Sequence, residues 1–200
     1  MNHIITISRE YGSGGHELAT RLSEKLGIPF YDREIIRMAA EKSGISMELV
    51  EETGEYKTMS WALNAAMPNI YTGNVMDMLP PADRVYIVQQ DLIRQIAAKG
   101  DCVMIGRCAD YILRDRNDVL KIFVTAPSDV KMKRVALRHP DLDEKGLKKR
   151  MEKIDRQRAA HNRHYTDREW GAAKNYDLCL NSGTLGLDAC VELAVKAFQS

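Results

Sequence analysis

The feature that most constrains this chain is a glycine-rich turn set between an apolar run and a helical repeat. The run "HIITI" comes first, and the turn "SREYGSGG" follows it directly. After the turn, Leu18, Leu22 and Leu26 recur at helical spacing. A strand, a glycine turn and a helix in this order are typical of a phosphate-binding loop, in which backbone N–H groups and a helix N-terminus converge on an anion.

The turn lacks the lysine that usually grips the phosphates in such a loop. In the pattern G-x-x-x-x-G-K-[ST], a second glycine at Gly14 puts Arg9 at the first glycine, Gly15 at the lysine and His16 at the Ser/Thr. The register shifted by one residue starts at Glu10 and fits no better. Two interpretations therefore stay open: a phosphate loop without its lysine, or a structural turn that needs glycine.

Four further apolar runs alternate with helical patterns along the chain. They are "IPFYD", "CVMIG", "VLKIFVT" and "YDLCLN", and an amphipathic pattern from Leu187 to Phe198 follows the last of them. This alternation predicts an α/β fold with a five-stranded parallel sheet flanked by helices. Such sheets bind ligands at the carboxyl ends of their strands, where the loop after Ile7 is expected to lie.

The composition fits one domain, or one domain with a small appendage, and excludes several classes of partner. Two hundred residues, 44% of them hydrophobic, suffice for a sizeable core. A net charge of +1 gives no case for binding to nucleic acid or to a membrane surface. No apolar stretch approaches the length of a membrane span, and four cysteines without CxxC spacing suit a reduced, cytoplasmic protein. The sequence leaves the oligomeric state open.

One segment departs from this even charge balance. Residues Lys145–Arg168 include nine Lys or Arg against three Asp or Glu, and their apolar periodicity is weak, so we expect this segment not to pack deeply. It is either a solvated helix with internal ion pairs or a mobile arm that folds over a polyanion. The residues of this segment that are candidates for a lid are Arg150, Asp155, Arg156, Arg158 and Arg163.

Several blocks, taken together, resemble the cytidylate kinase-like family, a branch of the nucleoside monophosphate kinases. They are "ITISREYGSGGHELATRLSEKLGIPFYDREII", "GDCVMIGRCADYIL", "LKIFVTAPSDVKMKRVALR", "IDRQRAAHNRHYTDREWG" and "NYDLCLNS". The resemblance implies one P-loop kinase domain. Its core would cover residues 1–32, 83–140 and 174–200, a helical monophosphate-binding region about 33–82, and a lid about 141–173. It also implies ATP and Mg²⁺ as cofactors and nucleotides as small-molecule substrates.

The resemblance further implies an acceptor site and a site for the donor nucleotide. Arg107 would grip the acceptor's phosphate, although Cys108 stands where the family usually has Asp. Asp110, Asp32 and Arg33 are further candidates for the acceptor site, with helix capping as the alternative for Asp32. Arg134 and Arg138 resemble the R-x-x-x-R of monophosphate kinases, in which one arginine stacks on the adenine and the other meets phosphate.

The remaining expectations concern the donor's phosphates. The residues expected to bind them are Arg9, Gly12, Ser13, Gly14, Gly15 and His16. Ser13 or Glu17 would meet magnesium, directly or through water. Arg138, Arg158 and Arg163 would supply the charge of the missing lysine when the lid closes.

The sequence thus predicts an ATP-dependent kinase that acts on a nucleoside monophosphate or a similar small molecule. The alternative is a non-catalytic nucleotide- or anion-binding protein on the same fold, either a sensor or a partner-binding module. The missing lysine favours the alternative, whereas the basic lid favours the enzyme.

Overall fold

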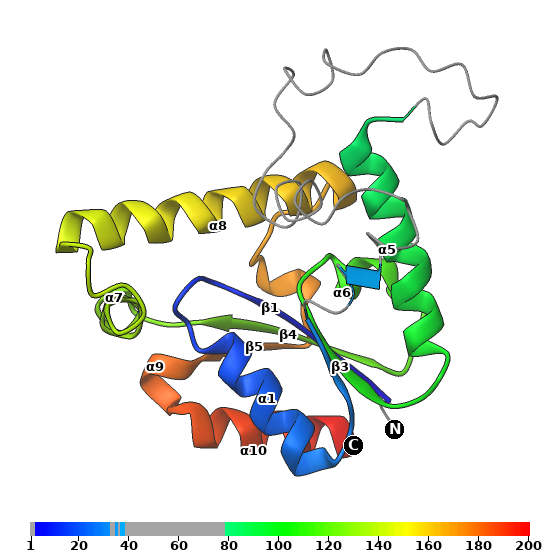
Figure 1. Ribbon diagram of the computed structural model, residues 1–200. Coiled ribbons are helices and arrows are strands. Elements are labelled where there is room, and N and C mark those ends of the chain that lie inside the picture. Colours follow the sequence, from blue (N-terminus) through cyan, green and yellow to red (C-terminus); the bar gives the residue numbers. More distant parts are fainter. Residues whose placement is uncertain (1–2, 33–34, 36, 39–78) are drawn as a thin grey trace.

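A single five-stranded sheet forms the centre of the fold, with all strands parallel in the order β2-β3-β1-β4-β5 (Figure 1). In this computed structural model the described residues are 3–32, 35, 37–38 and 79–200. The strands are β1 (Ile4–Arg9), β2 (Phe30–Tyr31), β3 (Cys102–Ile105), β4 (Val119–Thr125) and β5 (Leu178–Asn181). The predicted fold class and all five predicted strands are confirmed.

The inner strands are apolar because helices cover both faces of the sheet. Every residue of β1 is buried, and its alternate side chains enter two different cores. Ile5 and Ile7 pack on one face with Leu18 and Phe198, whereas Ile4 packs on the other face.

Two groups of helices provide these covers (Figure 1). One face carries α1 (Gly15–Leu26) and α10 (Leu187–Gln199), and the other carries α5 (Pro81–Ala97), α6 (Ala109–Ile112) and α8 (Glu144–Thr166). The remaining elements are α7 (Ser128–Ala136), α9 (Ser182–Leu185) and the 3-10 turn η2 (Ala173–Asn175). Within the described part of the chain, every helix is too short or too polar to cross a bilayer.

The glycine loop lies between the end of β1 at Arg9 and the start of α1 at Gly15. Because the strands are parallel, the segments that follow β1, β3 and β4 meet at the same edge of the sheet. The predicted position of the loop, at the carboxyl end of the first strand, is therefore confirmed.

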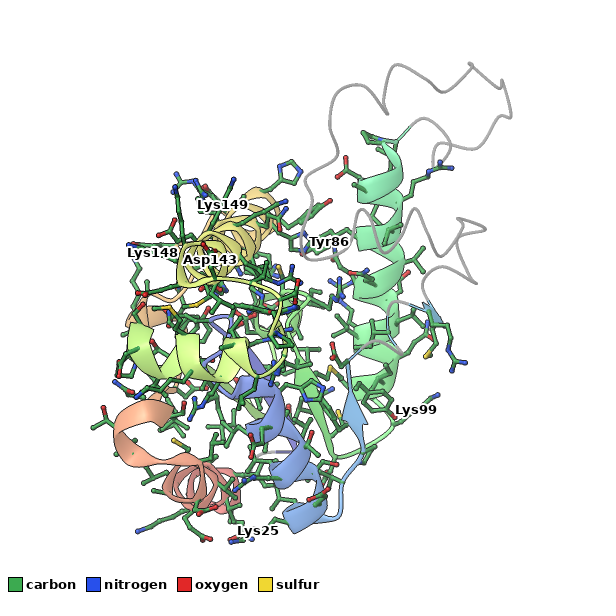
Figure 2. All side chains as sticks on the ribbon, turned by 60° about the vertical axis from the view of Figure 1, so that its left-hand side comes forward. Lys25, Tyr86, Lys99, Asp143, Lys148 and Lys149 are labelled. Atoms are coloured by element: carbon green, nitrogen blue, oxygen red, sulfur yellow. The ribbon has the colours of Figure 1, made fainter. Side chains whose placement is uncertain are left out.

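Helix α8 is one continuous helix of 23 residues, capped at its start by Asp143, which accepts a hydrogen bond from the N–H of Gly146 at 2.8 Å. Its N-terminal turns expose Lys148 and Lys149 (Figure 2). Its C-terminal half buries Arg158, His161, Asn162 and Thr166. The expectation that this segment does not pack deeply is therefore wrong for its second half. The reason is that much of the buried surface is polar and leaves no apolar repeat in the sequence.

The predicted helical monophosphate-binding region, about residues 33–82, falls mostly outside the described residues, and so does Arg33. The described chain resumes at residue 79, just before α5.

Candidate functional site

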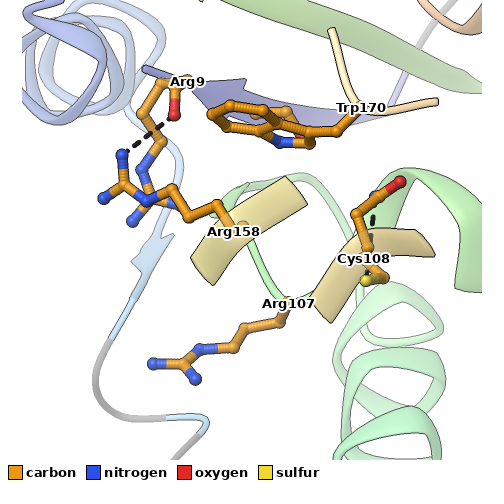
Figure 3. Close-up of a pocket in the computed structure, with 8 residues that line it drawn as sticks. Arg9, Arg107, Cys108, Arg158 and Trp170 are labelled. Carbon is orange, nitrogen blue, oxygen red and sulfur yellow. Dashed lines mark hydrogen bonds between the residues drawn. The ribbon is translucent and has the colours of Figure 1, made fainter. Parts of the chain in front are cut away.

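Three arginines from distant parts of the sequence line one small pocket at the carboxyl edge of the sheet (Figure 3). Arg9 ends β1, Arg107 follows β3, and Arg158 comes from α8. The three residues are only 8%, 4% and 7% exposed, respectively. Arginine is almost never this deeply buried unless it is paired, and we take the pocket where the three converge as the candidate site. The other residues that line the pocket are Ser8, Gly106, Cys108, Asn162 and Trp170.

The backbone around Arg107 takes an unusual conformation. Gly106, Arg107 and Cys108 have φ values of 72°, 59° and 54°, which are all in the left-handed region. For residues other than glycine this conformation costs roughly 1–2 kcal/mol each. Such strain persists where the surroundings fix it, and it clusters at functional sites. Here the turn brings Arg107 into the pocket, with the amide of Asn162 donating to the Cys108 sulfur at 3.9 Å.

Arg158 fastens α8 to the end of β1. Its Nη1 donates to the backbone carbonyl of Arg9 at 2.9 Å, and the same nitrogen lies 3.7 Å from Asp155 Oδ1. The guanidinium carbon lies 5.9 Å from the centre of the Tyr11 ring. The helix of the predicted lid thus contacts the backbone at the point where β1 leads into the glycine loop.

The arginine pocket is small in this structure, with a cavity of about 20 Å³. A cavity of this size has room for about one water molecule. A phosphate or carboxylate group is larger, so an anion can enter only when α8 or the arginine side chains shift.

The glycines of the loop are required by close packing. Gly12 and Gly14 have φ values of 80° and 83°. A Cβ on Gly12 would lie 2.8 Å from Val135 Cγ2, and a Cβ on Gly15 would lie 2.5 Å from Arg9 Cβ. These contacts call for glycine whether or not the loop holds an anion, so both interpretations of the glycine pattern stay open.

Ser13 and Arg134 belong to a chain of hydrogen bonds that ties the loop to α7 and α9. The hydroxyl of Ser13 is buried and donates to the Glu10 carbonyl at 2.8 Å, and Ser182 donates its hydroxyl to the Ser13 carbonyl. Arg134 Nη1 donates to Ser182 Oγ at 2.9 Å. This hydrogen bond leaves the lone pairs of the Ser13 oxygen unused, so the magnesium-binding role of Ser13 stays a prediction. The base-binding role of Arg134 stays a prediction.

Tyr11 is held on both its backbone and its side chain. Its N–H donates to Asp155 Oδ1 at 2.7 Å, and its hydroxyl lies 3.1 Å from His139 Nε2. Burial raises the pKa of Asp155, while the Tyr11 N–H and the charges of Arg158 and Lys131 oppose that rise. A carboxylate of α8 therefore already accepts a hydrogen bond from an N–H of the glycine loop, the kind of donor that an anionic ligand of the loop would use.

Two predicted site residues meet at the start of α1. His16 Nε2 lies 3.6 Å from Asp32 Oδ2, so the structure brings these two candidates together. Glu17, the other magnesium candidate, pairs instead with Arg21.

Asp110 lies in the first turn of α6 and is 4% exposed, but it is not among the residues that line the arginine pocket. Burial raises the pKa of its carboxyl group. Four predicted arginines are exposed and do not line the arginine pocket either: Arg138, Arg150, Arg156 and Arg163.

The sequence interpretation missed several residues of the site, among them Tyr11, Asn162, Trp170 and Lys131, whose ammonium pairs with Glu10 of the loop. A signal existed for Lys131, since it precedes Arg134 and Arg138 by three and seven residues and so shares their helix face. Nothing comparable in the sequence points to Asn162 or Trp170.

The described ranges, residues 3–32 and 79–200 together with 35 and 37–38, contain no group of three or more His, Cys, Asp or Glu side chains that could hold a metal ion. A magnesium ion with only one or two protein ligands, completed by phosphates and water, remains compatible with this observation.

The parallel sheet in this strand order, with a glycine loop at the carboxyl end of β1, defines a P-loop kinase fold. The chain belongs to the cytidylate kinase-like family, whose model matches residues 4–184. This match confirms the resemblance found in the sequence. No curated protein sequence matches the chain.

Solved structures support the same fold. The chain is 28% identical to an uncharacterized protein from Eubacterium ventriosum, with a TM-score of 0.72 and coverage of 100% of this chain and 99% of the other. A shikimate kinase from Bacteroides thetaiotaomicron is 13% identical, with a TM-score of 0.55 and 98% of each chain covered. A shikimate kinase from Acinetobacter baumannii in complex with shikimate is 11% identical, with a TM-score of 0.53 and coverage of 100% and 94%. At these identities the two kinases share the fold alone.

Proposed function

We propose that this protein is a phosphotransferase that uses ATP and Mg²⁺ and binds a small anionic acceptor through Arg107, together with Arg9 and Arg158. The observation that carries this proposal is the convergence of the three buried arginines on one pocket beside the glycine loop. The family membership and the P-loop kinase fold support it.

The residue types suit this chemistry. Planar guanidinium groups bind phosphate or carboxylate through paired hydrogen bonds. Phosphoryl transfer depends mainly on positioning and on neutralising crowded negative charge, and both are tasks that arginines perform. An acceptor phosphate is already ionised near neutral pH, so no general base is required.

The acceptor class in this proposal is a nucleoside monophosphate or a small molecule of similar charge. Cys108 stands where cytidylate kinases usually have Asp, which leaves the base specificity open. Two structural neighbours are shikimate kinases, one of them in complex with shikimate, so acceptors of this fold are not confined to nucleotides. Both classes belong in a substrate screen.

The donor side fits ATP through the loop backbone. The N-terminus of α1 follows the glycines directly, and its dipole favours a phosphate there. When it is bound, Mg²⁺ supplies charge neutralisation between the phosphates. It typically keeps several waters and one or two protein ligands, for which Glu17 is the more accessible candidate.

The test is a screen for ADP formation with ATP, Mg²⁺ and a panel of nucleoside monophosphates and small hydroxy acids. With the acceptor in hand, Arg107→Ala should raise the acceptor's KM or Kd by roughly tenfold or more, since it removes a charge-assisted contact. Affinity for ATP should stay within about twofold. The exposed Arg94→Ala is the matched control and should change neither value. An equal loss for both ligands would contradict the assignment of Arg107 to the acceptor.

A binding-only protein on the same fold is the second candidate, and one observation favours it. The protein's own groups, the carboxylate of Asp155 and the guanidinium of Arg134, already lie against the glycine loop. This candidate predicts that ATP binds but that no acceptor in the screen yields ADP.

A further inference from the structure

We infer that Lys131 supplies the phosphate-binding ammonium that the glycine loop lacks, reaching the loop from α7 instead of from the start of α1. This inference rests on the proposed function, since it assigns a residue to the donor's phosphates. It also differs from the sequence expectation, which gave this task to Arg138, Arg158 and Arg163.

The first observation is that α7 lies directly against the glycine loop at Lys131. A Cβ placed on Gly12 would be 2.9 Å from the carbonyl oxygen of Lys131 and 3.2 Å from its Cβ. The absence of a side chain at Gly12 thus allows this turn of α7 to reach van der Waals contact with the loop. In this way a lysine side chain starts within a few ångströms of the loop backbone.

The second observation is the position of the ammonium itself. Lys131 Nζ lies 2.9 Å from Oε2 of Glu10, which is a residue of the loop. The same oxygen accepts the hydroxyl of Thr125 at 2.6 Å, so the carboxylate is held from the end of β4. The Lys131 side chain is only 13% exposed. Glu10 therefore holds the ammonium at the loop, and this bond uses one of its three N–H donors.

The third observation is the space that Lys131 borders. A hollow of about 480 Å³ lies between α7 and α8, and Lys131 lines it together with Lys148, Arg156 and Asp155. This volume is in the range of ligand sites, which run from roughly 300 to 1,000 Å³. Three cations line the hollow, Lys131 from α7 and Lys148 and Arg156 from α8, against two carboxylates of α8, Asp155 and Glu152. Its size and its net positive lining suit a polyphosphate.

The chemistry of lysine matches this position. An ammonium is a compact charge on a flexible stem with rotatable donors, and it binds phosphate as a point charge. The described residues that line the hollow come from α7 and α8 and not from the glycine loop, and Lys131 links the two because it also pairs with Glu10. A donor that extends from the hollow to the loop would meet Lys131 from α7, with Lys148 and Arg156 from α8. The loop backbone would then supply N–H groups and α7 would supply the charge.

A purely structural role for Lys131, as the partner of Glu10, makes a different prediction. If Lys131 binds phosphate, Glu10 competes with the donor for the ammonium, so Lys131→Met and Glu10→Gln should affect binding in opposite directions. If the pair only stabilises the loop, both variants break the same bond and should weaken binding alike.

The experiment is isothermal titration of the full chain with Mg·ATP and with inorganic tripolyphosphate at fixed ionic strength. Lys131→Met should weaken tripolyphosphate binding roughly tenfold or more, as expected for a charge-assisted hydrogen bond, and Lys131→Arg should restore part of the loss. Glu10→Gln should bind at least as tightly as the wild type. Lys133→Met removes an exposed lysine from the same helix and should stay within about twofold. Circular dichroism and the melting temperature of each variant show whether it is folded.

The outcomes separate this inference from the proposed function. If the wild type binds neither probe, the proposed function fails. If the wild type binds but Lys131→Met binds equally well, or if Glu10→Gln and Lys131→Met lose affinity together, the assignment of Lys131 is overturned. If Lys131→Met does not fold, Glu10→Gln and Lys131→Arg still decide, because the inference requires Glu10→Gln to keep the wild-type affinity and Lys131→Arg to keep part of it.

Discussion

Gly12 packs directly against α7, and its substitution should be among the most damaging in the chain. A Cβ there would lie 2.8 Å from Val135 Cγ2 and 2.9 Å from the Lys131 carbonyl, on a backbone with φ at 80°. We expect Gly12→Ala to lower the free energy of unfolding by about 2–4 kcal/mol, the sum of a left-handed backbone cost and an overpacking cost. Urea denaturation monitored by circular dichroism measures this loss.

Gly27 provides the matched control for Gly12. Its φ is also positive, at 67°, but a Cβ there would meet nothing within 4 Å. Gly27→Ala should therefore cost only the backbone component, roughly 1 kcal/mol. Equal losses at the two positions would show that the close approach of α7 to Gly12 contributes nothing.

At the scale of single residues, the sequence predicts those site residues whose place follows from the backbone alone. Arg9 and Arg107 directly follow buried runs, so a parallel sheet brings both to its carboxyl edge. Tyr11 and Lys131 could not be assigned in this way, because their contacts depend on how α7 and α8 cross the loop. The way these helices pack across the loop is a property of the tertiary structure, so it cannot be read from the sequence pattern.

At the scale of elements, α8 is fastened to the loop by side chains that bind backbone groups. Asp155 accepts the N–H of Tyr11, and Arg158 donates to the carbonyl of Arg9. We expect Asp155→Ala to speed hydrogen exchange at the Tyr11 amide and along the second half of α8. The substitution leaves the partly buried N–H of Tyr11 without its acceptor, a change that costs about 1 kcal/mol. Hydrogen–deuterium exchange with mass spectrometry measures this faster exchange.

The control for this prediction is Lys153→Ala, which removes an exposed side chain from the same helix. Its exchange should match that of the wild type. If Asp155→Ala also matched the wild type, the hydrogen bond to Tyr11 would not hold α8 in place.

The elements themselves differ in how well the sequence indicates them. The strands were found because strands buried on both faces read as short β-branched runs, as in Ile4 to Ile7. The packing of α8 was missed because Arg158 and Asn162 are buried through hydrogen bonds and leave no apolar period. Polar burial of this kind is invisible to a search for hydrophobic repeats.

At the scale of the whole molecule, the chemistry-bearing segments gather at one edge of the sheet, and the opposite edge carries structural contacts. The glycine loop, the turn after β3 and the second half of α8 share the carboxyl edge. At the other edge the N–H groups of His3 and Ile4 bond to the Asp118 carbonyl, and the Asp118 side chain pairs with Arg116. Substitutions should accordingly affect binding at the first edge and stability alone at the second.

The pH dependence of global stability tests one buried carboxyl group, that of Asp110, which does not line the arginine pocket. Burial raises the pKa of Asp110, although the charges of Arg168 and Lys121 oppose the rise. Between the ordinary carboxyl pKa of 3.8 and the higher native value, the folded state binds more protons than the unfolded state, so Asp110 makes stability fall as pH rises through that window. Asp110→Asn removes this dependence, because an amide of nearly the same shape does not titrate.

The melting temperature of Asp110→Asn should therefore rise relative to the wild type between pH 4 and pH 7. Each kcal/mol corresponds to roughly 2–4 °C for a chain of this size. Asp115→Asn, at a carboxyl that is 85% exposed, should show a nearly constant difference from the wild type over the same range. If instead the wild type becomes more stable relative to the Asp110→Asn variant as pH rises, the charges of Arg168 and Lys121 outweigh the effect of burial. Asp110 would then be a stabilising carboxylate, with its pKa lowered instead of raised.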